Sequence, residues 1–313
     1  MENLIFSLNA VVPLFLIMVL GLVLKMRGFI DDAFVDTGTK VCFYVALPCL
    51  LFMIITKSDI TEAFDTPLTL LCVGGILICT VLLRLFTPRF IKDVRRSSAF
   101  IQACFHSNNV LLGLPFINNL VGAPGLAKTA TVLPFLVPLF NVLAVLILAE
   151  NQPQGGGMPR MLFKRIATNP LIITALLAVG CSFLPFQLPL LLERPLGYMS
   201  DMAMPLALFT LGASLRLGGE PQELRIVLAA SLIKLIIMPL VAILIAYRLA
   251  FDQVQMAVAF AIFAGPPAVS CFPMAFQMGA DHHLTSLIIV LGTGLSAVTM
   301  FGFVLALRML GWV

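Results

Sequence analysis

The sequence predicts an all-helical integral membrane protein, and its composition and pattern both support this. Of 313 residues, 60% are hydrophobic and 11% are charged, whereas a soluble domain carries roughly 25% charged and about 45–50% apolar residues. The apolar residues run in long stretches, unlike the ~10-residue alternating segments of a transmembrane β-barrel. A helix needs ~20 apolar residues to cross the hydrocarbon core, so the chain has room for about ten spans.

Each predicted span is a hydrophobic stretch bounded by charged or Pro/Gly-rich breaks. A polar stretch from Glu150 to Arg165 has the composition of a flexible linker, and it divides five spans from five. This gives a first five-helix unit at 1–149, a cytoplasmic linker at 150–166 and a second unit at 167–313. The predicted spans are residues 4–24, 36–56, 67–86, 98–120, 127–149, 167–184, 196–215, 225–249, 254–279 and 284–309.

The two five-helix units resemble each other in sequence. Motifs of the first unit recur after 157 residues, as from Pro13 to Pro170, with a slip of one residue inside the fourth and ninth spans. A unit with an odd number of spans must insert its second copy upside down, so we expect the inverted repeats of secondary transporters. The other matching positions are Ala46–Phe52 and Ala203–Phe209, Gly122 and Gly279, Phe105 and Phe263, and Pro115 and Pro273.

The distribution of Lys and Arg predicts the orientation. If the N-terminus is outside, twelve of these residues fall on the cytoplasmic side and five on the other, while Lys40 and Lys234 lie within spans. The positive-inside rule therefore places both termini outside the cytoplasm, in a cell (inner or plasma) membrane. The twelve are Lys25, Arg27, Arg84, Arg89, Lys92, Arg95, Arg96, Arg160, Lys164, Arg165, Arg216 and Arg225, and the five are Lys57, Lys128, Arg194, Arg248 and Arg308.

The fourth and ninth predicted spans contain residues that break helices. Proline removes a backbone donor and clashes with the preceding turn, and freed backbone within a membrane is tolerated only where it is buried in protein or lines a cavity. Paired broken helices point to a transport site, at which half-helices starting near Val110 and Ala268 would direct their N-terminal ends. The alternative is ordinary proline kinks, with Asn as a hydrogen-bonding link between helices.

The residues expected to contact substrate gather at these breaks. Pro48 could instead merely bend the second span, and Asn141 could make a packing hydrogen bond. Gly113, Pro115 and Pro273 are expected to shape the breaks. The full set of candidate substrate contacts is Pro48, Ser107, Asn108, Asn109, Val110, Asn141, Gly265, Pro266, Pro267 and Ser270.

Three ionisable residues are candidates for charge compensation or coupling. Lys234 lies two to three turns inside the eighth span, where burial costs several kcal/mol unless the charge is paired; alternatively it extends to the membrane interface. Asp201, in the first turns of the seventh span, could pair with Lys234, exchange protons or lie at the interface. His106 could titrate near neutral pH or be a packed, hydrogen-bonded side chain.

The remaining sequence excludes several classes of function. The broken motifs contain no Asp or Glu to hold a cation, so half-helix ends, amides and a nearby Lys favour an anionic substrate. The sequence has no ATP-binding motif, metal-ligand spacing or catalytic constellation, and no basic run with interleaved aromatics. We therefore expect no enzyme activity, no cofactor and no nucleic-acid binding.

Several motifs, in order, resemble the auxin efflux carrier family, which includes plant exporters and bacterial malonate-type carriers. The resemblance covers essentially the whole chain and implies ten helices with a crossing of the broken fourth and ninth, as in bile-acid symporters and the antiporter NhaA. It also implies an elevator mechanism, in which a transport domain moves against a scaffold, and small carboxylate substrates. The motifs are Ala10-Val11-Val12-Pro13-Leu14, Ala46-Leu47-Pro48, Asn108 through Pro115, Lys234 through Pro239 and Gly265-Pro266-Pro267.

By the same resemblance, Asn108 is the substrate-contacting asparagine of the crossing and Pro266 is its counterpart. The short central linker departs from the long loop of many plant exporters, while Asn109 and the Pro266-Pro267 pair affect the shape of the pocket.

The leading prediction is a secondary carrier that moves a small auxin-like or malonate-like carboxylate through the lipid bilayer by alternating access, with a homodimer left open. One alternative is an ion-coupled symporter of the bile-acid-symporter type. Another is a channel-like pore, which would need a continuous polar stripe on several helices.

Overall fold

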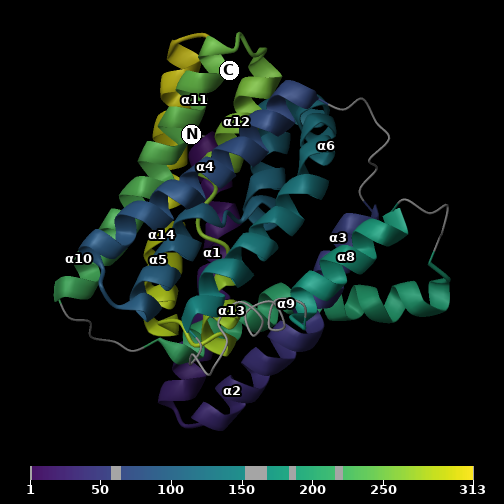
Figure 1. Cartoon of the computed structure of the whole chain (residues 1–313), viewed down its shortest axis with the longest axis vertical. Coiled ribbons are helices and arrows are strands. Elements are labelled where there is room, and N and C mark those ends of the chain that lie inside the picture. Colours follow the sequence, from purple (N-terminus) through teal and green to yellow (C-terminus); the bar gives the residue numbers. More distant parts are fainter. Residues whose placement is uncertain (1, 58–64, 152–167, 183–187, 216–220, 313) are drawn as a thin grey trace.

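The apolar stretches form long helices that pack side by side and cross at the centre of the molecule (Figure 1). The computed structural model describes residues 2–57, 65–151, 168–182, 188–215 and 221–312. Its α-helices are α1 (Glu2–Met26), α2 (Asp32–Val41), α3 (Leu47–Lys57), α4 (Thr66–Phe90), α5 (Val94–Phe105), α6 (Leu114–Leu148), α8 (Pro170–Ser182), α9 (Leu190–Ser214), α10 (Pro221–Leu232), α11 (Met238–Arg248), α12 (Gln253–Ala264), α13 (Cys271–Gln277) and α14 (His282–Met309).

The prediction of an all-helical membrane protein is confirmed. Within the described part of the chain, five helical segments are long and apolar enough to cross a membrane: Asp32–Lys57, Thr66–Phe90, Phe116–Asn151, Glu223–Arg248 and His282–Leu307. Their outward faces carry large apolar side chains that are exposed in the isolated chain, such as Ile78 on α4 and Leu244 on α11. Such faces fit a lipid environment.

The described helices lie close to most of the predicted spans, although α9 begins at Leu190 rather than near residue 196. The predicted gap between the fourth and fifth spans falls at Gly122, whose φ of 66° and ψ of −152° are non-helical, so α6 consists of two helical segments that meet there at a kink. A positive φ of this kind favours glycine. The predicted linker at 150–166 falls, from residue 152 on, outside the described residues.

Three helices are preceded by a wide π-helical turn, and each of the three has proline at its second residue. The turns are Cys42–Ala46, Asn109–Gly113 and Ile233–Ile237, followed by Pro48, Pro115 and Pro239. Proline lacks an N–H and clashes with the carbonyl one turn earlier, and a π turn is one way in which a helix accommodates such an irregularity. A bend at Pro48 is expected from the sequence, whereas the π-helical turn before it is not.

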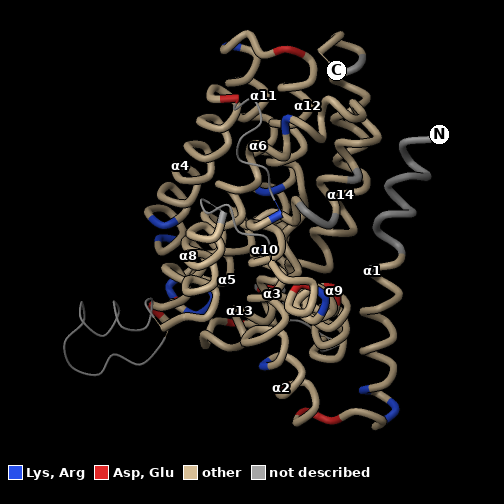
Figure 2. Tube along the Cα trace, turned by 90° about the vertical axis from the view of Figure 1, so that its right-hand side faces the viewer, with Lys and Arg blue, Asp and Glu red and all other residues tan. Residues whose placement is uncertain are grey.

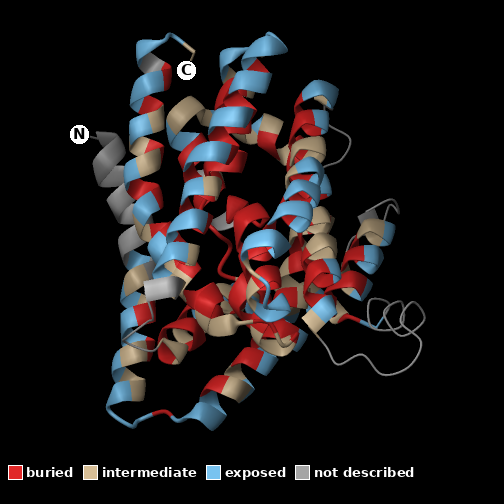
Figure 3. Cartoon of the chain, turned by 60° about the vertical axis from the view of Figure 1, so that its left-hand side comes forward, coloured by how far each residue is buried: buried red, intermediate tan, exposed pale blue. Residues whose placement is uncertain are grey.

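The helices form two packed groups. In one, α1 packs on α9, and α3 packs on α8 and α9; in the other, α12 packs on α6 and α11, while α14 packs on α5 and α10. Buried residues concentrate in the middle of the molecule, and exposed residues lie on the outer faces (Figure 3). The start of α1 and the end of α14 lie toward the same end of the molecule, and α2 lies at the other (Figure 1).

Charged residues are sparse along the helices (Figure 2), and one cluster of them joins the starts of α4 and α12 to α6. The Asp65 carboxylate accepts hydrogen bonds from Lys128 Nζ at 2.7 Å and Gln255 Nε2 at 2.8 Å, and Lys128 also lies 3.6 Å from Asp252. Burial raises the pKa of the Asp65 carboxyl, but the hydrogen bonds from Lys128, Gln255 and the Leu68 N–H together hold it below its usual value. The cluster is therefore stable with Asp65 ionised.

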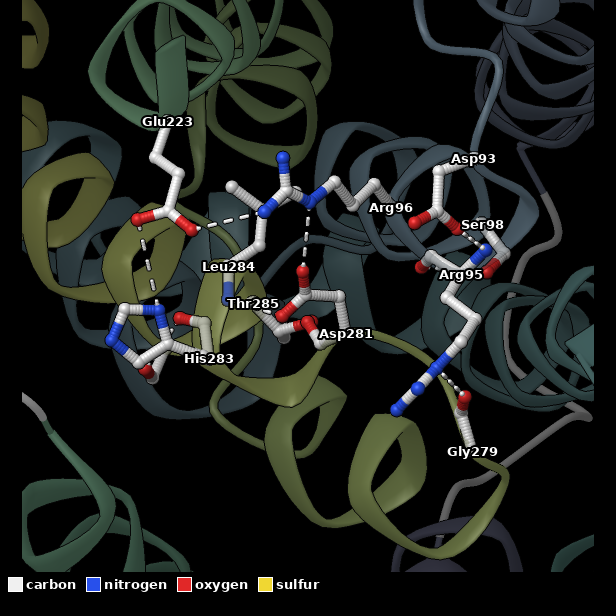
Figure 4. Close-up of polar contacts among 11 residues, drawn as sticks. Asp93, Arg95, Arg96, Ser98, Glu223, Gly279, Asp281, His283, Leu284 and Thr285 are labelled. Carbon is white, nitrogen blue, oxygen red and sulfur yellow. Dashed lines mark hydrogen bonds and ion pairs between the residues drawn. The ribbon is translucent and has the colours of Figure 1, made fainter. Parts of the chain in front are cut away.

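A second cluster joins the starts of α5, α10 and α14 (Figure 4). Arg96 donates to Asp281 and to Glu223, both at 3.3 Å, and His283 Nδ1 lies 4.0 Å from the other Glu223 oxygen. The two clusters hold together the ends of the helices that surround the central crossing.

Candidate functional site

Two interrupted helices cross at the centre and pair with each other through their backbones. α5 ends before one break and α12 before the other. The Asn108 N–H donates to the Pro266 carbonyl at 2.8 Å, and the Ala268 N–H donates to the His106 carbonyl at 2.9 Å. Unpaired backbone groups would be costly here, so each break satisfies groups that the other break frees.

Close packing fixes this crossing from two sides. Pro267 lies opposite Ser107 in the antiparallel pairing, and a Cβ on Gly292 of α14 would come within 2.9 Å of Pro267 Cδ. A Cβ on Gly265 would lie 3.1 Å from Asn109 Oδ1. The glycines thus let α14 and the second break approach the first break closely.

A cavity of about 260 Å³ opens beside the crossing. This volume lies just below the ~300–1,000 Å³ of sites for drug-sized ligands, so the cavity suits a small substrate. Its described lining residues come from α3, α6, α9 and both breaks: Leu47, Leu50, Leu51, Ile54, His106, Ser107, Asn108, Asn109, Val137, Phe140, Asn141, Ser200, Asp201, Met204, Ala268 and Ser270.

The first break presents amide groups that lack hydrogen-bond partners. Asn108 and Asn109 are 3% and 4% exposed. Both of their Nδ2 atoms, and Oδ1 of Asn109, are buried without a partner among the described residues. Buried polar atoms in native proteins are nearly always hydrogen-bonded, so these amides are available to a ligand in the cavity.

His106 also lines the cavity and packs against two aromatic rings, which also contact each other. Its ring stacks on Phe140 with centroids 5.1 Å apart and on Phe105 at 6.1 Å. Its Nδ1 is buried without a partner among the described residues. The His106 ring is therefore packed, and its Nδ1 has no partner among the described residues. A role of His106 in coupling stays a prediction.

Lys234 lies behind the first break. It is fully buried, within the π-helical turn that precedes α11, and its ammonium donates a hydrogen bond to the Ser107 hydroxyl. No carboxylate in the described part of the chain forms an ion pair with it. The expectation that it reaches the membrane interface is wrong, because the side chain is directed inward to a group that itself lines the cavity.

Asp201 borders the cavity, whereas Lys234 is not among its described lining residues. Asp201 lines the cavity from α9 next to Ser200, and no ion pair between Asp201 and Lys234 forms among the described residues. The suggested pairing of these two residues is therefore wrong for this conformation. Asp201 is an exposed residue that borders the cavity, and both proton exchange and a place at the membrane interface stay predictions.

The other predicted residues divide between the crossing and its surroundings. Asn141 lines the cavity but donates to the Val137 carbonyl at 2.8 Å, which supports the packing reading. Ser270 lines the cavity as well. The structure does not place Pro48, Gly113, Gly265, Pro266, Pro267 or Pro273 among the cavity-lining residues; Val110 and Pro115 belong to the turn and helix that follow the first break.

The two half-helices begin differently from the prediction. The π-helical turn that follows the first break starts at Asn109, within one residue of the expected Val110. The second half-helix, α13, starts at Cys271 rather than near Ala268 and has only seven residues. Pro266 and Pro267 keep the chain non-helical up to α13. Because α13 is short, its N-terminal end carries only a weak helix dipole.

Sequence reasoning missed the apolar wall of the cavity. Leu47, Leu50 and Leu51 of α3, Phe140 of α6 and Met204 of α9 line it. One signal was available, since Leu47 and Met204 precede Pro48 and Pro205 in the motif that recurs after 157 residues.

Interrupted helices that cross beside a cavity within a membrane protein indicate a membrane carrier. The model of the family described as membrane transport protein matches residues 6–154 and 156–304. The chain therefore belongs to this family, that of the auxin efflux carriers, as the sequence resemblance predicted. It is a multi-pass membrane transporter and not an enzyme.

Two relatives match most of the chain. An "Uncharacterized transporter" of Methanothermobacter thermautotrophicus is 26% identical over 296 residues, which cover 94% of this chain and 96% of that protein. A "Putative malonate transporter" of Rhizobium meliloti is 26% identical over 280 residues, which cover 85% of this chain and 84% of that protein.

Proposed function

We propose that this transporter is a secondary carrier for a small organic anion of the carboxylate class, with malonate as the first compound to test. The observation that carries the proposal is the pair of buried, unpartnered Nδ2 donors of Asn108 and Asn109 beside the small cavity. Amide donors hydrogen-bond carboxylate oxygens well. The name of the Rhizobium meliloti relative supports the same class.

The charges around the cavity favour an anion whose movement is coupled to another charge. Lys234, behind Ser107, supplies a fixed positive charge close to the amides. Asp201 contributes a carboxylate at the border of the cavity, which would repel a bound anion unless it carries a proton. We therefore assign proton exchange to Asp201, so that substrate and proton occupy the cavity together.

The second candidate function is an ion-coupled symporter of the bile-acid-symporter type. Asp201 is the observation that favours it, because the same carboxylate could hold a metal cation in place of a proton. Uptake assays with an imposed proton gradient or an imposed sodium gradient separate the two candidates.

The architecture that we propose has ten spans in two inverted five-helix repeats, 1–149 and 167–313, joined by a cytoplasmic linker. The family matches on either side of residue 155 support this division, as do the two breaks with their mutual backbone bonds. The group of α1, α2, α3, α8 and α9 acts as the scaffold, and the other group carries the crossing in an elevator movement.

Both termini lie outside the cytoplasm in this proposal, in the inner or plasma membrane. The start of α1 and the end of α14 lie toward the same end of the molecule (Figure 1), which supports a common side. A periplasm-active reporter fused at Val313 should be active and a cytoplasm-active one silent. The reverse result contradicts the orientation.

The substrate class is tested by thermal unfolding of the purified protein with malonate, acetate, indole-3-acetate and, as a charge control, choline. A ligand at about 100 times its Kd adds ~2.7 kcal/mol of stability, so a bound carboxylate should raise the Tm. Stabilisation by choline alone contradicts an anion carrier.

A further inference from the structure

A second cavity of about 160 Å³ lies at the end of α6, close to where the linker begins. Its described lining includes Ala149 and Thr168, which flank the linker on either side. Phe43, Tyr44 and Gln277 also line it. No charged residue lines it among the described residues, so its polar chemistry comes from amides and hydroxyls.

This second cavity repeats the feature that marks the first one, an amide donor without an acceptor. Gln277 Nε2 is buried and has no partner among the described residues. Asn169, 8% exposed, directs Nδ2 at the Met278 sulfur at 3.9 Å, and a thioether is a weak acceptor. An anionic oxygen would satisfy both donors better than the protein does.

The two cavities also share walls. Along α6, Asn141 lines the first cavity and Val145 the second, four residues or ~6 Å further on. Along α13, Ser270 borders the first cavity and Gln277 the second, ~10 Å apart. The shared walls thus run from the crossing toward Gln277.

The two cavities are also lined by positions that correspond in the sequence repeat. Phe43 and Tyr44 line the second cavity, and Ser200 and Asp201, 157 positions later, line the first. Positions related by the repeat therefore border the two cavities. Inverted repeats generate two routes to one site.

We propose that the second cavity is a further carboxylate-binding site, where Gln277 and Asn169 receive the anion on the linker side of the crossing. This inference rests on the proposed function. It gives these two amides a role in passage between the crossing and the aqueous phase at that face.

Charge substitution in reconstituted protein tests the site. Gln277→Glu preserves shape but replaces the donor by a negative charge, and Asn169→Asp keeps the oxygen that accepts the Leu171 N–H at 2.9 Å and caps α8. Each variant should slow malonate transport in proteoliposomes by at least about tenfold, because a like charge within ~5 Å is strongly repulsive even at an effective dielectric constant of ~20. Gln277→Leu should give a smaller loss.

The matched control is Gln253→Glu, the same change at an exposed glutamine at the start of α12, which should transport as the wild type does. The malonate-induced rise in Tm should persist in Gln277→Glu, because the amides of Asn108 and Asn109 are intact. Wild-type rates in both Gln277→Glu and Asn169→Asp, or faster transport, would overturn the inference. If the wild type itself neither binds nor transports malonate or another carboxylate, the proposed function fails instead.

Discussion

The two broken helices meet at one crossing but contribute different groups to it. The first break presents three polar side chains in a row, Ser107, Asn108 and Asn109, all of which line the cavity. The second break presents Gly265, Pro266 and Pro267, which supply backbone and shape. Of the described residues of the second break, Ala268 and Ser270 line the cavity.

This difference has a physical basis. Proline carries no N–H, so two consecutive prolines leave fewer backbone donors to satisfy inside the membrane. The Pro266 carbonyl and the Ala268 N–H of the second break pair with the first break. The first break is thereby held in place from behind, and its amides are free to face a ligand. This difference supports the proposal that the first break binds substrate and the second break positions the first.

The largest expected effect comes from removing an amide of the binding break. Asn108→Ala should reduce carboxylate transport by about 10- to 100-fold, because a hydrogen bond to a charged group contributes ~1.5–3 kcal/mol. Uptake is measured in proteoliposomes at equal protein content. Asn119→Ala, at an exposed asparagine of α6, is the control, and equal loss in both variants would break the comparison.

The next largest effect concerns the charge behind the first break. Lys234→Gln should reduce transport about tenfold, since a unit charge acting over ~10 Å at an effective dielectric constant of ~20 contributes ~1.7 kcal/mol. Lys234→Arg should rescue poorly, because a planar fork does not replace a compact ammonium.

The control is Lys40→Gln, whose lysine is half exposed and paired with Asp36 at 2.6 Å; it should keep the wild-type rate. Transport by Lys234→Gln at the wild-type rate would show that the buried ammonium is only structural.

A smaller effect is expected from changing the supporting break. Gly265→Ala places a Cβ 3.1 Å from Asn109 Oδ1, so the amide must shift, and transport should fall a few-fold. Gly74→Ala, where no atom lies within 4 Å of the added Cβ, serves as the control and should transport normally. An unchanged rate in Gly265→Ala would mean that the second break does not position the first.

The smallest effect on transport, but a measurable one on stability, is expected far from the crossing at Asp65. Because its pKa is depressed in the folded protein, its stabilising contribution is present above the pKa of the unfolded state and is lost as pH falls through the folded pKa. Asp65→Asn should cost about 1–3 kcal/mol at neutral pH and lessen the acid dependence of the Tm. Asp36→Asn removes an exposed ion pair worth about 0–1 kcal/mol, so this control should leave both the stability at neutral pH and the acid dependence of the Tm unchanged.

The sequence was sufficient to predict the class of fold, the positions of both breaks and the depth of Lys234. Periodicity and composition indicate those features, since a membrane requires long apolar helices and tolerates breaks only where they are buried in protein or line a cavity. The apolar wall from Phe140 and Met204 left a weaker trace, because apolar residues are common throughout such helices.

Contacts between distant segments could not be predicted. The hydrogen bond from Lys234 to Ser107 spans 127 positions, and nothing in the local pattern of either segment specifies it. The placement of Asp201 at the border of the cavity depends on how α9 packs against α3. The late start of α13 follows from backbone pairing between the two breaks, which is again a long-range property.

The central claim is that a carboxylate binds the amides of the first break, and malonate binding to purified Asn108→Asp tests it most directly. The variant keeps the shape of the side chain while replacing the donor by a negative charge, and Asn119→Asp controls for the added charge. Malonate should raise the Tm of the wild type and of Asn119→Asp and leave that of Asn108→Asp unchanged. An equal rise in Asn108→Asp and the wild type would contradict the claim and place the substrate elsewhere.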